Sequence, residues 1–165
     1  MRLKIWLLAL TLSAAGAWGQ WLEFRPAAHP LEGKPAPDFT LEDANGKKVS
    51  LSALKGKMVV LDFWATWCPP CVEGLPKIWR VMQMHPGVVF YAVNLQESNA
   101  DVEKFLQMEK LAKLPVLLDK DGKVANAYQV TGIPETVIIG KDGVIRKIHV
   151  GLMKDVKKEL GAVLK

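Results

Sequence analysis

Cysteine is scarce in this chain of 165 residues, which contains only Cys68 and Cys71. Two cysteines exclude a small scaffold held together by several disulfides. Histidine is scarce as well, and His29, His85 and His149 stand singly in unlike contexts. A structural zinc site needs four ligands at chelating spacing, of which the cysteine pair supplies only half. We therefore predict no metal and no cofactor, and we keep a zinc half-site and an inert structural disulfide as alternatives.

A strong excess of charge is also missing. The formal net charge is +5 at pH 7, and two of the positive charges, Arg2 and Lys4, lie at the extreme N-terminus. The densest group of lysines, at residues 154–158, is interleaved with acidic residues, as on a solvated helix face. This mild balance gives no argument for binding nucleic acid. Internal repeats and low-complexity tracts are absent, and the length suits one domain of ordinary size.

The N-terminus is the one segment whose composition departs from that of a folded domain. Arg2 and Lys4 precede an apolar stretch at 5–12, which runs into small residues ending at Gly19. This order is typical of a secretory signal peptide. Left uncleaved, residues 5–22 are long enough to span a bilayer as an anchor. We predict a signal peptide or membrane anchor at residues 1–19, and a folded domain outside the cytoplasm in either case.

Proline marks the next segment. Residues 20–33 have few apolar positions in any period and include Pro26 and Pro30, which indicates an extended linker. The domain is expected to occupy residues 34–165. Outside the cytoplasm its thiols are not kept reduced by the cytosolic pool, so a dithiol there needs its own supply or sink of electrons.

Strand and helix patterns alternate along this domain. Apolar runs predict strands, Asn45-Gly46 and Asp142-Gly143 predict hairpin turns, and apolar residues at helical spacing predict helices. The expected elements are a hairpin of 39–41 with 49–51, a strand at 58–64, a helix carrying the cysteines, a strand at 88–95, a helix from Ser98, a strand at 115–118, a helix at 122–130, a hairpin of 136–140 with 144–150, and a final helix at 153–163. We predict an α/β fold with a central mixed sheet flanked by helices and an extra N-terminal β-hairpin.

The cysteine pair follows directly after the apolar run at 58–64, in the sequence Trp67-Cys68-Pro69-Pro70-Cys71. A strand that delivers Cys-x-x-Cys to the start of a helix is typical of a redox dithiol. Cys68 would lie at the positive end of the helix dipole, which favours its thiolate, and is the expected nucleophile. Cys71 lies one turn further on and is the expected resolving thiol.

Asp62 interrupts the apolar run that should be buried. A buried carboxylate is costly, so its pKa rises or it finds a partner. The functional interpretation is a proton acceptor for Cys71, placed beneath the helix, because resolution requires that thiol to ionise. The alternative is a solvated position at the edge of a strand.

The neighbours of the cysteines also bear on their chemistry. Pro69 and Pro70 have no N–H groups, which removes two possible donors to a Cys68 thiolate and favours a comparatively reducing couple. Trp67 has a packing role by default and is alternatively the exposed apolar rim of a protein-docking surface. Pro134 begins a strand, where its peptide bond is either cis or trans. Glu135 would be an exposed loop carboxylate by default, or would act on Cys68 ionisation or substrate choice if Pro134 faces the dithiol.

Together the motifs at 63–71 and 132–134 resemble the thioredoxin superfamily over residues 34–165. The segments at 36–41, 51–57 and 91–94 resemble the extracytoplasmic TlpA/ResA-like thiol:disulfide oxidoreductases. The segment Gly132-Ile133-Pro134-Glu135-Thr136 resembles the DsbE/CcmG branch used in cytochrome c maturation. The resemblance implies a thioredoxin-like fold, a cis-proline at Pro134 opposite the dithiol, and an acidic residue near the active site at Glu135. It departs from the ResA-like pattern at Gly74, where those proteins usually carry glutamate.

The resemblance further implies a protein-disulfide reductase in the bacterial periplasm or on the outer face of the cytoplasmic membrane. Its electrons would come from a membrane thiol transporter, and its substrates would be apocytochrome c or other secreted proteins. A disulfide-forming oxidant or isomerase is the alternative with the same chemistry. A thiol peroxidase is less favoured, because that family needs threonine three residues before its cysteine and Ala65 stands there. A Cu(I) chaperone that holds the metal between the two thiolates is a further alternative.

Overall fold

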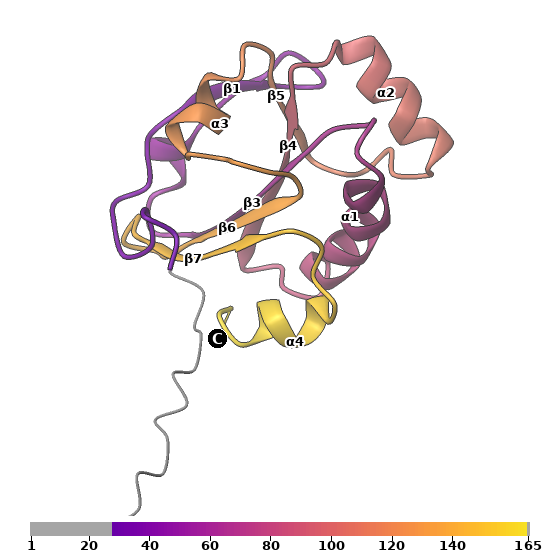
Figure 1. Ribbon diagram of the computed structural model, residues 1–165. Coiled ribbons are helices and arrows are strands. Elements are labelled where there is room, and N and C mark those ends of the chain that lie inside the picture. Colours follow the sequence, from indigo (N-terminus) through magenta and orange to yellow (C-terminus); the bar gives the residue numbers. More distant parts are fainter. Residues whose placement is uncertain (1–27, 165) are drawn as a thin grey trace, which may run out of the picture.

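The computed structural model describes residues 28–164 (Figure 1). The predicted leader or anchor at 1–19 and the predicted linker as far as residue 27 lie outside this range. Within it, no helix has the length and hydropathy needed to cross a membrane.

A seven-stranded mixed sheet forms the centre of the domain, in the order β2-β1-β5-β4-β3-β6-β7 (Figure 1). Strands β3, β4 and β5 are parallel, and the remaining neighbours pair antiparallel. The strands are β1 (Thr40–Asp43), β2 (Lys48–Ser50), β3 (Met58–Trp64), β4 (Val88–Leu95), β5 (Val116–Asp119), β6 (Glu135–Ile139) and β7 (Ile145–Val150). The mixed sheet and the extra hairpin β1–β2 confirm the prediction.

Strand β3 lies inside the sheet, between β4 and β6. Six of its seven residues are buried, which explains why the sequence shows a nearly continuous apolar run rather than alternation. Because β3 and β4 are parallel, their carboxyl ends meet at one edge of the sheet. Ligands of open α/β sheets bind outside that edge, and the cysteine segment begins there.

The helices cover both faces of the sheet. They are α1 (Pro69–Met82), α2 (Asn99–Met108), α3 (Lys123–Ala127) and α4 (Val156–Gly161), with a short 3-10 turn at Leu51–Leu54. Buried residues of α1, α2 and α4 share one hydrophobic core, and buried residues of α3 belong to the core on the opposite face. Helix α3 is shorter than the predicted 122–130 because Gln129 adopts a left-handed conformation with φ of 57°, which a helix does not accommodate.

The packed domain begins before Lys34. Residues 28–33, expected to belong to the extended linker, include a turn in which Leu31 is buried. The Gly33 N–H donates to the Ile145 carbonyl at 2.9 Å, and Glu32 Oε1 accepts the Ile148 N–H at 2.8 Å. Prolines 30 and 35 therefore shape a segment that lies along β7. The prolines in the sequence correctly indicate an irregular segment, but they do not indicate whether that segment packs against the domain.

Candidate active site

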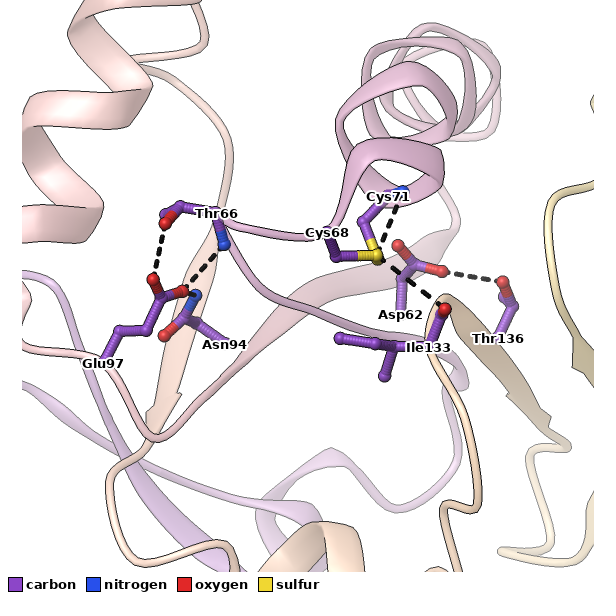
Figure 2. Close-up of a disulfide and its surroundings, with 8 residues drawn as sticks. All are labelled: Asp62, Thr66, Cys68, Cys71, Asn94, Glu97, Ile133 and Thr136. Atoms are coloured by element: carbon purple, nitrogen blue, oxygen red, sulfur yellow. Dashed lines mark hydrogen bonds between the residues drawn. A yellow bond between two sulfur atoms is a disulfide. The ribbon is translucent and has the colours of Figure 1, made fainter.

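Cys68 and Cys71 form a disulfide at the start of α1, with a sulfur–sulfur distance of 2.04 Å. Cys68 is the N-cap residue of the helix, and its Sγ accepts the Cys71 N–H at 3.3 Å (Figure 2). An N-cap side chain normally accepts from the second or third N–H of its helix. Here Pro69 and Pro70 occupy the first two positions and carry no N–H, so the third, from Cys71, is the donor that remains.

The two sulfur-bearing residues differ in exposure in the predicted order. Cys71 is completely buried, whereas Cys68 retains 4% of its surface. Cys68 Sγ lies 3.7 Å from the carbonyl oxygen of Ile133, and the Ile133–Pro134 peptide bond is cis (Figure 2). The structure thus places Pro134 next to the residue that faces the dithiol, with the cis bond that the resemblance implied.

An open groove runs beside Cys68. Its volume is about 440 Å³, and it is lined by Trp67, Leu95, Gln96 and residues 130–133. Trp67 is 68% exposed, which excludes a packing role for this side chain within the described residues. The groove and the exposed indole fit the prediction of an apolar rim next to the nucleophile.

Asp62 lies on β3, and Figure 2 shows its carboxylate directed toward the disulfide end of α1. The residue has no exposed surface, so a solvated strand edge is excluded. Its Oδ1 accepts the Thr136 hydroxyl at 2.7 Å, while Oδ2 has no hydrogen-bond partner among the described residues. Burial raises the pKa of Asp62 to about 7, and the hydrogen bond from Thr136 opposes part of that rise. A carboxyl of this kind can accept and release a proton near neutral pH.

Glu135 does not occupy an exposed loop, so that expectation is wrong. It is the first residue of β6, completely buried, and neither carboxylate oxygen has a hydrogen-bond partner within residues 28–164. Burial raises its pKa to about 7. Side chains alternate along a strand, so Glu135 shares the face of Val137, whereas Thr136 faces Asp62 and α1. Glu135 therefore directly follows the Ile133–Pro134 segment that faces the dithiol, but its side chain lies on the opposite face of the sheet.

Sequence reasoning missed a third acidic residue, Glu97. Its carboxylate accepts the Thr66 N–H at 2.8 Å, the Thr66 hydroxyl at 2.5 Å and the Asn94 side-chain amide at 2.7 Å (Figure 2). One signal was available: Glu97 follows the end of β4, as Thr66 follows the end of β3, and parallel strands bring those ends together.

Across residues 28–164, no three histidine, cysteine, aspartate or glutamate side chains lie together in a way that could hold a metal ion.

Comparison with known proteins places this geometry in a family. The AhpC/TSA family model matches residues 33–148. The thiol-disulfide oxidoreductase ResA of Bacillus subtilis is 41% identical over 126 residues, covering 75% of this chain and 70% of that protein. Among solved structures, a thiol:disulfide interchange protein DsbE from Chlorobium tepidum has a TM-score of 0.73 at 32% identity, covering 84% of this chain and all of the other. The exposed lipoprotein thioredoxin of Streptococcus pneumoniae has a TM-score of 0.68 at 32% identity, covering 76% and 97%.

These matches confirm the predicted thioredoxin-like fold and the predicted resemblance to ResA and DsbE proteins. The match covers most of the domain and includes both cysteines. The chain therefore belongs to the AhpC/TSA family and, within it, to the ResA-type thiol-disulfide oxidoreductases.

Proposed function

We propose that this protein reduces disulfides in proteins outside the cytoplasm, with Cys68 as nucleophile and Cys71 as resolving thiol. The observation that carries the proposal is the arrangement at the start of α1. Trp67, which precedes Cys68, and Ile133, whose carbonyl oxygen contacts Cys68 Sγ, line an open groove. Cys71 is completely buried, and a buried carboxylate with one unpaired oxygen, that of Asp62, lies on β3 within the described residues. An attacking sulfur next to a substrate groove and a sheltered second sulfur suit sequential thiol exchange.

The reaction starts from the reduced dithiol. The Cys68 thiolate attacks one sulfur of the substrate disulfide, and the other substrate sulfur leaves as a thiolate that takes up a proton. Cys71 then gives its proton to Asp62 and attacks Cys68 Sγ, which releases the second substrate thiolate. The protein ends with the Cys68–Cys71 disulfide and the substrate with two thiols. Two electrons and two protons must then enter from a donor to restore the dithiol.

Asp62 is proposed as the base of the second step. With a pKa of about 7, about half of the Asp62 carboxyls are still ionised at neutral pH, and the raised pKa makes that carboxylate a stronger base for the Cys71 proton. The Glu135 side chain lies on the other face of the sheet. In sequence, Glu135 follows shortly after residues 131–133, which line the groove. We therefore assign Glu135 to the support of that groove wall, and so to substrate choice, rather than to sulfur chemistry.

The substrate class and the location extend the proposal. The signal peptide or anchor predicted at 1–19 would place the domain in the periplasm or on the outer face of the membrane. One structural relative is named as an exposed lipoprotein, which agrees with that location. An open groove with a tryptophan rim suits an extended polypeptide, and apocytochrome c is the proposed substrate. A membrane thiol-electron transporter is the proposed donor, because secreted thiols have no cytosolic reductant.

An equilibrium redox titration of the chain from Gln20 onward tests the direction of electron flow. The fraction of alkylated Cys68 and Cys71 is measured across a graded thiol/disulfide buffer. A midpoint near or below about −220 mV supports the reductase, whereas a midpoint near about −120 mV indicates a disulfide-forming oxidant. Turnover of hydrogen peroxide, or tight retention of one Cu(I) without disulfide reduction, would instead support the peroxidase or the chaperone.

A further inference from the structure

Glu97 makes several hydrogen bonds near the dithiol, although the proposed reaction gives this residue no role. Its two carboxylate oxygens receive three hydrogen bonds, two of them from Thr66. Thr66 is separated from Cys68 only by Trp67, in the loop between β3 and α1. Glu97 lies in a different loop, the one between β4 and α2. The contacts therefore join two loops that are 31 residues apart in sequence.

The backbone next to Glu97 adopts an unfavourable conformation, which costs conformational free energy. Gln96 has φ of 56°, the left-handed region that residues other than glycine rarely adopt. The Gln96 N–H donates to the Asp119 carbonyl at 3.1 Å, which continues the pairing of β4 with β5 up to the turn. The chain bends at this left-handed residue, and the carboxylate of the next residue, Glu97, contacts Thr66 just beyond the end of β3. Strained residues held in this way are concentrated at functional sites.

Asn94 supports the same carboxylate from the floor of the sheet. It is the penultimate residue of β4, pairs with Trp64 of β3 and is 1% exposed. Its side-chain amide donates to Glu97 Oε2, the oxygen that also accepts the Thr66 N–H. The Glu97 carboxylate is thus held between Asn94 of β4 on one side and Thr66 of the cysteine loop on the other (Figure 2).

Residues next to Thr66 and next to Glu97 line the groove beside Cys68. Trp67 follows Thr66 on one side, and Leu95 and Gln96 precede Glu97 on the other, and all three line the groove. We propose that Glu97 is a positioning residue for protein substrates: through Thr66 it sets the distance between the Trp67 wall and the Leu95–Gln96 wall. This inference rests on the proposed reductase function of the groove.

A role in positioning predicts a selective defect. A small disulfide reaches Cys68 without using the groove walls, so its reaction depends on the sulfur alone. A peptide must lie along the walls, and a shift of about 1 Å in a positioning contact costs up to about 100-fold in rate. Loss of the Glu97 contacts should therefore reduce the reaction with a peptide disulfide and leave the reaction with a small disulfide nearly unchanged.

The experiment compares two oxidised substrates with the reduced chain from Gln20 onward. One is a synthetic peptide with a Cys-x-x-Cys-His disulfide, and the other is 5,5′-dithiobis(2-nitrobenzoate). The variants are Glu97→Ala and Glu97→Gln, with Thr66→Val and Thr66→Ser as a pair that removes or keeps the hydroxyl. Glu109→Ala, an exposed residue just after α2, is the control for loss of a negative charge.

For Glu97→Ala we expect kcat/KM for the peptide to fall about 10- to 100-fold, mainly through KM, while the rate with the small disulfide stays within about twofold. Thr66→Val should show a smaller loss in the same direction, and Thr66→Ser and Glu109→Ala should match the parent. Equal losses with both substrates, or no loss with either, would overturn the positioning role. If Glu97→Ala fails to fold, Glu97→Gln and Thr66→Val give the same comparison.

The parent protein separates this inference from the proposed function. If the parent does not reduce the peptide, the reductase function itself is wrong. If the parent reduces the peptide and the substrate ratio is the same in every Glu97 variant, only the positioning role is wrong.

Discussion

Thr136 on β6 donates its hydroxyl hydrogen to Asp62 on β3 across 2.7 Å, and both residues are buried. This is the one hydrogen bond that the described residues offer to the Asp62 carboxylate. Burial is the main reason that Asp62 ionises with difficulty. Hydrogen bonds to a charged group are worth about 1.5–3 kcal/mol, so the bond from Thr136 offsets part of that cost.

Replacing Thr136 with valine should therefore raise the pKa of Asp62 above its present value of about 7. We expect the pH midpoint of the resolving step to move upward by about one unit. The measurement is the single-turnover release of reduced peptide between pH 5 and 9. Thr136→Ser keeps the donor and should retain the parent profile, and a valine variant with an unchanged midpoint would contradict the assignment.

Replacing Asp62 with asparagine removes the proposed base. General bases contribute at least about 100-fold, so release of the second substrate thiol should slow by about that factor at pH 7.5, with the first attack by Cys68 unaffected. In the parent the release rate should fall as the pH drops below 7, because Asp62 becomes protonated. Equal release rates in the two proteins at pH 7.5 would exclude Asp62 from this step.

The two buried carboxyls also link stability to pH. The pKa values of Asp62 and Glu135 are raised in the fold to about 7, from ordinary values of 3.8 and 4.5. Groups of this kind bind protons more tightly when folded, so their contribution is complete below about pH 4 and is lost as the pH rises through 7. We expect the disulfide form to lose on the order of 3 kcal/mol per carboxyl over this range.

Urea unfolding at pH 4.5 and 7.5 measures that loss, and the disulfide form is suitable because its cysteines do not titrate. Glu135→Gln should remove a large part of the decline, since an amide does not ionise. The exposed substitution Glu109→Gln should leave it in place. A decline that is unchanged by Glu135→Gln would contradict the raised pKa.

The proline pair gives a prediction about redox potential. Pro70 occupies the second position of α1, from which an N–H can reach an N-cap acceptor, and Pro69 occupies the first. Pro70→Ala should supply a second donor to the Cys68 thiolate, lower its pKa and raise the reduction potential by about 20–40 mV. Pro69→Ala is the matched control and should change the potential much less. A larger effect from Pro69→Ala would reverse the assignment of the donor.

The roles of the two cysteines are separable by trapping. Cys71→Ser leaves Cys68 able to attack but nothing to resolve the product, so a mixed disulfide with the peptide should accumulate in about one-to-one yield. Cys68→Ser should form little adduct, because Cys71 is completely buried. Mass spectrometry of the non-reduced protein distinguishes the two, and preferential trapping on Cys71 would exchange their roles.

Much of the fold was predictable because its central elements carry strong local signals. The strand at 58–64 was predicted at its observed bounds, because a strand buried on both faces leaves an apolar run with clear ends. The strand at 88–95 was likewise predicted at its observed bounds. The helix predicted at 122–130 ended early at a left-handed glutamine, a conformation for which glutamine gives no sequence signal.

The candidate site divides in the same way. The cysteines and Asp62 were predictable because each is conspicuous in its local context: a motif, and a charge within an apolar run. Glu135 was not, because its burial depends on how β6 pairs with β3, and pairing is decided by residues far apart in sequence. Glu97 was missed for a related reason. Its partner Thr66 lies 31 residues away, and only the parallel register of β3 and β4 brings the two together.

The turn that precedes Lys34 also covers part of the edge of the sheet, where another chain could otherwise pair. Strand β7 is an outer strand, and outer strands present unpaired backbone groups that can template association between copies. Residues 33–36 pair with residues 143–145, and Glu32 occupies the N–H of Ile148. A fragment beginning at Lys34 would lack Glu32 and Gly33. It would expose backbone groups at the edge of β7, which favours self-association. We therefore expect residues 28–33 to lower the tendency of the domain to aggregate through this edge.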